Sequence, residues 1–338
     1  MIDVAPIISN GTDSDVRAVA AAIDEACRDL GFFVISGHGI DPQLRRDLDD
    51  AAREFFALPD ETKAAIAMPR AGIAWRGWFP VGGELTSGRP DQKEGIYFGQ
   101  EHGADHPGVK ARRPLHGANL FPQQPQRLRP LVLDYLDALT TLGQGVLEAV
   151  ALALGLPRGW FRTNLTDDPV VLFRIFHYPP AQPTADDWGV GEHTDYGLLT
   201  LLGQDDNAGL QVRTTNGWVD VPPDADTFVC NIGDMLERLT GGRYRSTPHR
   251  VRNTSGAERL SYPFFLDPSW DAAVDRLPIV ERPPDDDETA AQRWDHASVH
   301  GFSGTYGDYL LQKVSKVFPE LAAQPTGAGS KAGTATAS

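Results

Sequence analysis

The second half of the chain carries a succession of short β-favouring segments, and this pattern restricts the possible folds more than any other feature of the sequence. Turn-forming Asp, Asn and Gly residues separate the segments. Many short strands at such spacing predict an antiparallel sandwich or barrel. The expected strands cover residues 170–177, 193–202, 210–212, 218–221, 227–232, 249–251 and 259–266.

The first half favours helices instead. Apolar residues recur at three- and four-residue intervals from 126 to 156, and Gly155 and Pro157 then end the pattern. This segment predicts a scaffold helix packed against a sheet, with a coiled coil as the alternative. Residues 68–99 are rich in aromatics without a clear period and predict a functional loop. Further expected elements are strands over 2–8 and 31–36, helices over 14–30, 42–56 and 306–318, and a short helix from Pro59.

Charge and cysteine content narrow the classes of partner. The 338 residues include 46 acidic and 31 basic side chains, and the formal charge of −15 argues against a nucleic-acid or anionic-membrane binder. Cys27 and Cys230 provide no disulfide framework and fit a reducing cytoplasm. The sequence shows no apolar run of about 18 residues and no signal-peptide pattern. We therefore expect a cytoplasmic protein, although the overall charge says little about a small-molecule substrate, because an acidic protein can contain a local basic pocket.

The tripeptide His193-Thr194-Asp195 precedes the apolar run 198–202. On an extended strand, residues i and i+2 point to the same face, so His193 and Asp195 could reach one common point. They would supply two members of a 2-His-1-carboxylate triad, the ligand set of non-haem iron oxygenases. Because such tripeptides also arise by chance, the alternative is an ordinary polar strand end. Among the nine histidines, His249 is the candidate third ligand, since it begins a β-like segment 54 residues after Asp195.

A second pair of residues follows the same spacing rule. Arg259 and Ser261 share one face of the last expected strand. A guanidinium offers a bidentate fork to a carboxylate, and a Ser hydroxyl adds a further donor. Beside a metal, this pair could hold the far end of a dicarboxylate. The alternative is that Arg259 pairs with a structural acid, Glu258 or Asp267.

Together, these motifs resemble the Fe(II)/2-oxoglutarate oxygenases of the isopenicillin N synthase-like family, also called iron/ascorbate-dependent oxidoreductases. Residues 31–40, 174–180 and 231–234 resemble the family's N-terminal strand and turn, the strand ahead of the first ligand, and the turn before the distal His. Residues 91–95 and 116–119 resemble bacterial, fungal and plant members of a less specialised branch. The resemblance covers nearly the whole chain.

The resemblance implies an α+β fold, a double-stranded β-helix (jelly roll) core flanked by helices. We expect a single oxygenase domain over 1–320, composed of a helical and loop region (1–125), a scaffold helix (126–157), the jelly-roll core (168–270) and a C-terminal region (271–320). Residues 321–338 are rich in Ala, Gly, Thr and Ser and predict a disordered tail.

By the same resemblance, His193, Asp195 and His249 would bind Fe(II). Arg259 and Ser261 would hold the 5-carboxylate of 2-oxoglutarate. Tyr178 would be an additional donor, although Phe176 replaces an Asn that relatives carry nearby. With O2, and ascorbate as a reductant, the enzyme would hydroxylate, desaturate or cyclise a small metabolite, releasing succinate and CO2. Candidate substrate contacts are Trp75, Arg76, Trp78, Glu94 and Tyr97, with ordinary packing as the alternative.

The resemblance further suggests a role in specialised metabolism, such as antibiotic biosynthesis, and a monomer or homodimer. Three other interpretations stay open at this point. The protein could be an iron oxidase that needs no 2-oxoglutarate, because relatives of that kind also carry the Arg-x-Ser motif. It could be an enzyme that fragments 2-oxoglutarate to ethylene. It could also be a catalytically silent jelly-roll binding protein.

Overall fold

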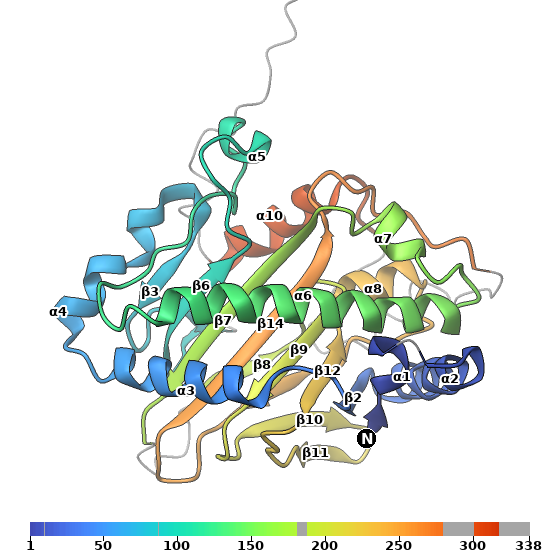
Figure 1. Cartoon of the computed structure of the whole chain (residues 1–338), viewed down its shortest axis with the longest axis horizontal. Helices are drawn as coiled ribbons and strands as arrows, with labels where there is room; N and C mark the ends of the chain where they lie inside the picture. Colours follow the sequence, from blue (N-terminus) through green and yellow to red (C-terminus); the bar gives the residue numbers. More distant parts are fainter. Residues whose placement is uncertain (10, 87, 181–187, 280–300, 318–338) are drawn as a thin grey trace, which may run out of the picture.

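The computed structural model describes residues 1–9, 11–86, 88–180, 188–279 and 301–317. Within them, two facing sheets form the core (Figure 1). The eight-stranded sheet has the order β1 (Ile2–Asp3), β2 (Phe32–Ser36), β12 (Phe228–Ile232), β9 (Leu199–Gln204), β14 (Arg259–Ser269), β7 (Pro169–Tyr178), β6 (Glu94–Gly99) and β3 (Gly77–Phe79). The four-stranded sheet has the order β11 (Gly217–Asp220), β10 (Leu210–Thr214), β13 (His249–Val251) and β8 (Val190–His193).

The chain passes repeatedly between these two sheets, which is what makes the core a jelly roll. β8 lies in the small sheet, β9 in the large one, β10 and β11 in the small one, β12 in the large one, β13 in the small one and β14 in the large one. Apart from the parallel β1–β2 pair, every pairing in these two sheets is antiparallel. The fold expected from the sequence is confirmed.

Helices cover the outer face of the large sheet. α6 (Leu128–Ala153) runs across the strands, with α2 (Asp13–Asp29) and α3 (Pro42–Phe56) beside it (Figure 1). α6 approaches β14 closely, because a Cβ on Gly143 would lie 2.9 Å from Leu266. The other α-helices among the described residues are α1 (Ala5–Ile8), α4 (Asp60–Lys63), α5 (Pro107–Lys110), α7 (Trp160–Asn164), α8 (Asp234–Leu239) and α10 (Tyr306–Val317).

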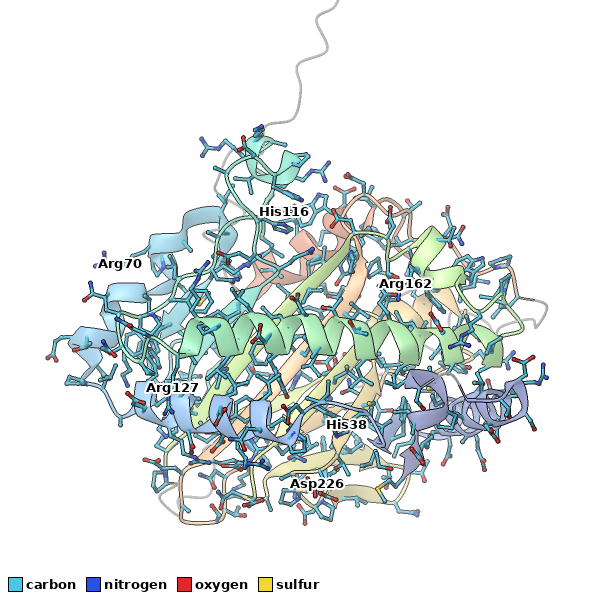
Figure 2. All side chains as sticks on the ribbon, viewed as in Figure 1. His38, Arg70, His116, Arg127, Arg162 and Asp226 are labelled. Carbon is cyan, nitrogen blue, oxygen red and sulfur yellow. The ribbon has the colours of Figure 1, made fainter. Side chains whose placement is uncertain are left out.

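The inner strands bury both faces. On β9, Leu199 and Leu201 join the apolar cluster beneath the helices, whereas Thr200 and Leu202 point into the barrel. By contrast, the charged side chains Arg70, Arg127 and Arg162, labelled in Figure 2, are exposed. By length and composition, α6 could cross a membrane. Its buried apolar residues, however, belong to the same core cluster as those of the large sheet, as predicted for a scaffold helix.

Three expectations need correction. Segment 193–202 is not one strand: β8 ends at His193 in the small sheet and β9 starts at Leu199 in the large one. Segment 2–8 contains only the short β1, because α1 follows at once with a Pro in its first turn. Segment 68–99 is no simple loop, since it supplies β3 and β6, whose complete burial removes the alternation that predicts a strand. The expected tail at 321–338 lies outside the described residues.

Candidate metal and co-substrate site

The structure brings His193, Asp195 and His249 together inside the barrel mouth. One potential ligand atom from each lies within 4.8 Å of the others. The contact follows from the pairing of β8 and β13, which sets His193 directly opposite His249. Asp195 lies two residues beyond the end of β8, where the chain crosses to the large sheet. Its Oδ1 atom is 3.9 Å from His193 Nε2 and 3.8 Å from His249 Nε2.

Hydrogen bonds orient all three side chains toward one point. The Nδ1 atom of His193 lies 2.8 Å from the Gly191 carbonyl, and that of His249 lies 3.3 Å from the Thr247 carbonyl. Carbonyls accept only, so each Nδ1 carries the proton and each Nε2 keeps a free lone pair. The other Asp195 oxygen, Oδ2, accepts hydrogen bonds from neighbouring side chains at 2.5 Å and 2.7 Å. The donors are Thr200 and Asn231.

The protonation states suit a divalent cation. Burial lowers the pKa of His249 to about 4, so its imidazole is neutral at pH 7. Burial works to raise the pKa of Asp195, but the two imidazoles and the hydrogen bonds from Asn231 and Thr200 lower it overall. Neutral imidazole and ionised carboxylate are the forms that bind metals, and two His with one carboxylate are the ligands of non-haem Fe(II). The residues present therefore fit an iron ion.

Two glycines allow the crossing after Asp195 to pack tightly. A Cβ on Gly197 would lie 1.4 Å from an oxygen of Asp267, and a Cβ on Gly233 would lie 2.4 Å from the Gly197 carbonyl. The amide of Asp234 donates to the Asp195 carbonyl at 2.8 Å. Backbone packing thus fixes the position of the carboxylate ligand.

Arg259 and Ser261 lie further along the barrel on β14, paired with Tyr178 and Phe176 of β7. The Arg259 side chain is fully buried, and its Nη1 atom has no hydrogen-bond partner among the described residues. Neither Glu258 nor Asp267 pairs with it, so the structure does not support the alternative of a structural ion pair. The Tyr178 hydroxyl is 3.4 Å from Ser261 Oγ. A buried guanidinium with one nitrogen unsatisfied, near two hydroxyls, is a site for a carboxylate.

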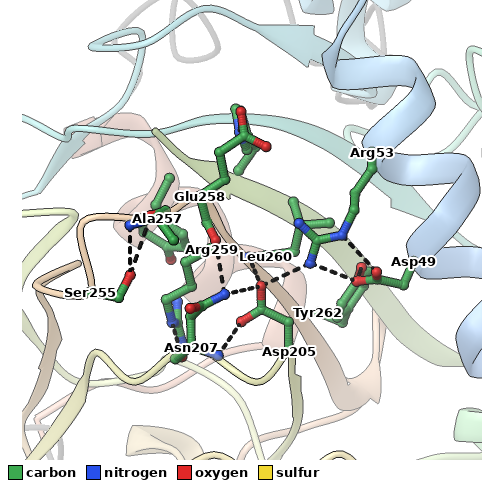
Figure 3. Close-up of polar contacts among 12 residues, drawn as sticks. Asp49, Arg53, Asp205, Asn207, Ser255, Ala257, Glu258, Arg259, Leu260 and Tyr262 are labelled. Atoms are coloured by element: carbon green, nitrogen blue, oxygen red, sulfur yellow. Dashed lines mark hydrogen bonds and ion pairs between the residues drawn. The ribbon is translucent and has the colours of Figure 1, made fainter. Parts of the chain in front are cut away.

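A polar network outside the barrel holds Arg259 in place (Figure 3). Arg259 donates from Nη2 to Gln204 at 2.9 Å and from Nε to the Asn207 carbonyl at 3.1 Å. The buried carboxylate of Asp205 accepts from the Asn207 amide at 3.0 Å and from the Leu260 amide at 2.7 Å. Arg53 of α3 also donates to Asp205, at 3.0 Å. Helix α3 is thereby connected to the loop that supports Arg259.

One cavity of about 340 Å³ contains the ligand triad and the Arg259 end together. Of the candidate substrate residues, Trp75 and Tyr97 line it. The other three are among the buried residues but are not in its lining. Arg76 donates to Asn119 and to backbone carbonyls, and Trp78 donates to Glu94 at 2.8 Å.

Sequence reasoning missed several charged residues of this cavity, among them Glu84, Lys93, Arg174 and Lys313. Lys93 pairs with Glu84 at 2.8 Å and also with Asp91. The signal for Arg174 was available, because it lies four residues before Tyr178 and so on the same face of β7.

Comparison with known proteins agrees with this site. The family model for the 2OG-Fe(II) oxygenase superfamily matches residues 169–268, and a model for the N-terminal part of a non-haem dioxygenase in morphine synthesis matches residues 1–124. A Dictyostelium discoideum protein described as an iron/ascorbate oxidoreductase is 45% identical, covering 95% of this chain and 96% of its own. The 1-aminocyclopropane-1-carboxylate oxidase of the same organism is 36% identical, covering 97% of each.

A solved structure of a full-length Neurospora crassa protein in complex with alpha-KG is also similar. It has a TM-score of 0.78 and 25% identity, covering 94% of this chain and 95% of that chain. A small-molecule substrate is consistent with this family. The chain therefore belongs to the 2OG-Fe(II) oxygenase superfamily, as an isopenicillin N synthase-like oxidoreductase that uses Fe(II), 2-oxoglutarate and O2.

Proposed function

We propose that His193 Nε2, His249 Nε2 and Asp195 Oδ1 hold the Fe(II) of this oxygenase. The support is the convergence of these atoms within 4.8 Å, with the remaining nitrogen of each imidazole turned toward a backbone carbonyl. Bound iron, with 2-oxoglutarate and O2, supplies the oxidant for a substrate C–H bond, while 2-oxoglutarate is converted to succinate and CO2. The protein's own part is to orient the ligands and to exclude water.

We propose that Arg259, Ser261 and Tyr178 hold the 5-carboxylate of 2-oxoglutarate. The observation that carries this assignment is the buried Nη1 atom of Arg259, which lacks an acceptor among the described residues. A carboxylate there would accept from Arg259 and from the two hydroxyls, removing the penalty of an unsatisfied buried donor. Phe176 lies opposite Ser261 on β7, and its ring would offer the co-substrate no hydrogen bond.

Anaerobic equilibrium dialysis with Fe(II) tests the metal assignment. The wild-type protein should bind one Fe(II) per chain, and Asp195→Ala and His249→Ala should lose it. His38→Ala is the matched control, because His38 is a buried histidine outside the cavity. Full Fe(II) binding by both ligand variants would disprove the assignment.

Anaerobic calorimetry with 2-oxoglutarate tests the second assignment. Arg259→Met should weaken binding roughly 10- to 100-fold, because hydrogen bonds to charged groups are worth about 1.5–3 kcal/mol. Arg213→Met is the control, since Arg213 is exposed and pairs with Glu192 outside the cavity. Equal losses of 2-oxoglutarate affinity in the two variants would contradict a specific carboxylate site at Arg259.

The relative named 1-aminocyclopropane-1-carboxylate oxidase favours a second candidate, an iron oxidase that needs no 2-oxoglutarate. Oxygen consumption measured with and without 2-oxoglutarate separates the two. Ascorbate fits either enzyme as a reductant that keeps iron ferrous.

For the protein as a whole, we propose a cytoplasmic monomer or homodimer that binds neither nucleic acid nor membranes. The support is the charge of −15 and the two buried free cysteines, and sedimentation analysis tests the oligomeric state.

A further inference from the structure

A second guanidinium, that of Arg174, faces the cavity that contains the ligand triad. Arg174 lies four residues before Tyr178 on β7, so both side chains point into the barrel. Along the strand, four residues span roughly 13 Å. A five-carbon dicarboxylate held at the Tyr178 and Arg259 end is therefore too short to occupy Arg174 as well. Any acceptor that Arg174 binds belongs to another molecule.

Arg174 has no close hydrogen-bond acceptor among the described residues. Its Nε atom is buried and unpartnered. The nearest carboxylate oxygen is Oε1 of Glu84, at 3.7 Å, which is beyond hydrogen-bond distance. That oxygen already accepts from the Tyr97 hydroxyl, and Oε2 pairs with Lys93 at 2.8 Å. Lys93 is shared between Glu84 and Asp91, so Glu84 also offsets part of the charge of Arg174. At 3.7 Å, however, Glu84 does not satisfy the hydrogen-bond donors of the guanidinium.

Arg76 shows how a purely structural buried arginine looks in this protein. Its guanidinium donates to the carbonyls of Ala74, Gln100 and Leu115 and to Asn119, at 2.7–3.2 Å. Arg174 instead resembles Arg259, the other cavity arginine with a buried nitrogen lacking an acceptor. The comparison indicates a ligand-binding role for Arg174.

Two aromatic rings hold the Arg174 guanidinium. Its central carbon lies 4.2 Å from the Tyr97 ring centroid and 5.0 Å from that of Phe265. Aromatic contacts of this kind occupy the faces of the guanidinium and leave its N–H edges free for a planar acceptor. The arrangement therefore favours a carboxylate, which accepts two parallel hydrogen bonds from such an edge.

The rest of the lining limits the charge of this ligand. Lys93 and Lys313 also reach the cavity, but each already pairs with a carboxylate, Lys313 with Asp234 at 3.3 Å. Arg174 is therefore the cavity cation whose hydrogen-bond donors lack an acceptor, and the nearby Glu84 disfavours a dianion. Apolar side chains complete the wall, including Leu85, Leu172 and Val314.

We propose that Arg174 binds the carboxylate of the substrate, and that this oxygenase acts on small monocarboxylic acids with an otherwise largely apolar body. This inference rests on the proposed function, because it places the substrate beside the proposed Fe(II) ligands. The acid would be held at Arg174 while its apolar part extends toward His193, Asp195 and His249.

The test compares aliphatic and aryl monocarboxylic acids with their primary amides, which keep the shape but remove the charge. Calorimetric titrations use the full chain, anaerobic, with Fe(II) and saturating 2-oxoglutarate. For at least one pair, the acid should bind wild type at least about tenfold more tightly than its amide. In Arg174→Gln this preference should collapse to less than about threefold, and Arg174→Lys should keep part of it. Lys313→Gln, which removes a cavity cation that is already paired, should retain the full preference.

Two outcomes would overturn the proposal: no acid in the panel binds better than its amide, or Arg174→Gln retains the wild-type preference. The wild-type comparison remains decisive even if Arg174→Gln fails to fold. A separate titration of 2-oxoglutarate distinguishes failure of the substrate inference from failure of the proposed function. If 2-oxoglutarate binds and depends on Arg259 while acids and amides bind alike, the substrate inference alone fails. If 2-oxoglutarate does not bind, the proposed function itself fails.

Discussion

Replacing Asp205 with alanine should weaken 2-oxoglutarate binding although Asp205 does not contact the proposed carboxylate site. Its carboxylate fixes Asn207, whose carbonyl accepts from Arg259 Nε at 3.1 Å. It also accepts from the Leu260 amide at 2.7 Å, next to Arg259 on β14. Without Asp205, Asn207 and the Leu260 backbone both lose this anchor, and of the two bonds to the guanidinium only the one to Gln204 is unaffected. We therefore regard Asp205 as a positioning residue for Arg259.

The magnitude follows from these hydrogen bonds. A hydrogen bond to a charged group is worth about 1.5–3 kcal/mol, and partial loss of the Arg259–Asn207 bond would cost about 1.4 kcal/mol, or tenfold in affinity. Stability should fall too, by about 1–3 kcal/mol, because the buried Leu260 amide loses its acceptor. Arg53→Ala removes only a partly exposed donor to Asp205 and should change stability by less than about 1 kcal/mol.

Steady-state kinetics of 2-oxoglutarate consumption provides the assay. Asp205→Ala should raise the KM for 2-oxoglutarate about tenfold while kcat changes less than about threefold. Asp205→Asn, which keeps an acceptor oxygen, should recover part of the affinity. If KM stays at the wild-type value in a folded Asp205→Ala protein, or if kcat alone falls, the positioning role is refuted.

Burial works to raise the pKa of Glu84, but Lys93 and other cations lower it to about 2. Ionised Glu84 therefore stabilises the fold above about pH 4.5, and this contribution is lost as the pH falls toward 2. The loss of stability with falling pH, followed by circular dichroism, should therefore be less steep for Glu84→Gln than for the wild-type protein. Gly197→Ala should cost about 1–3 kcal/mol or more, because the new Cβ would lie 1.4 Å from an Asp267 oxygen; a wild-type Tm would contradict the packing argument. Arg76→Met should destabilise the protein by about 3 kcal/mol through unpaired buried acceptors, yet leave the 2-oxoglutarate affinity of the folded fraction unchanged.

Sequence patterns were most informative where the two faces of a helix or strand differ in polarity. The scaffold helix and most jelly-roll strands were predicted for this reason. The crossing at Asp195 was not, because residues 198–202 continue the apolar run and no local signal says that the chain changes sheets there. β3 and β6 were not predicted, because side chains on both of their faces are buried and the alternation of apolar and polar residues is lost.

The candidate site was predictable wherever two functional residues share a strand face. His193 and Asp195 were identified in this way, as were Arg259 and Ser261. The acceptors that orient the imidazoles are backbone carbonyls, which no side-chain pattern can indicate. Trp78 and Glu94 looked like substrate contacts because they are polar or aromatic, but they bond to each other in the interior, and a sequence alone does not distinguish a polar core network from a binding wall.

The central claim is that the carboxylate of Asp195 completes the iron site on which 2-oxoglutarate turnover depends. The most direct test is succinate release by purified wild-type and Asp195→Ala proteins with Fe(II), ascorbate and 2-oxoglutarate, after circular dichroism has verified that both are folded. We predict that wild type releases succinate only when Fe(II) and O2 are both supplied, and that Asp195→Ala releases none above background. Succinate release by Asp195→Ala at the wild-type rate would contradict the account.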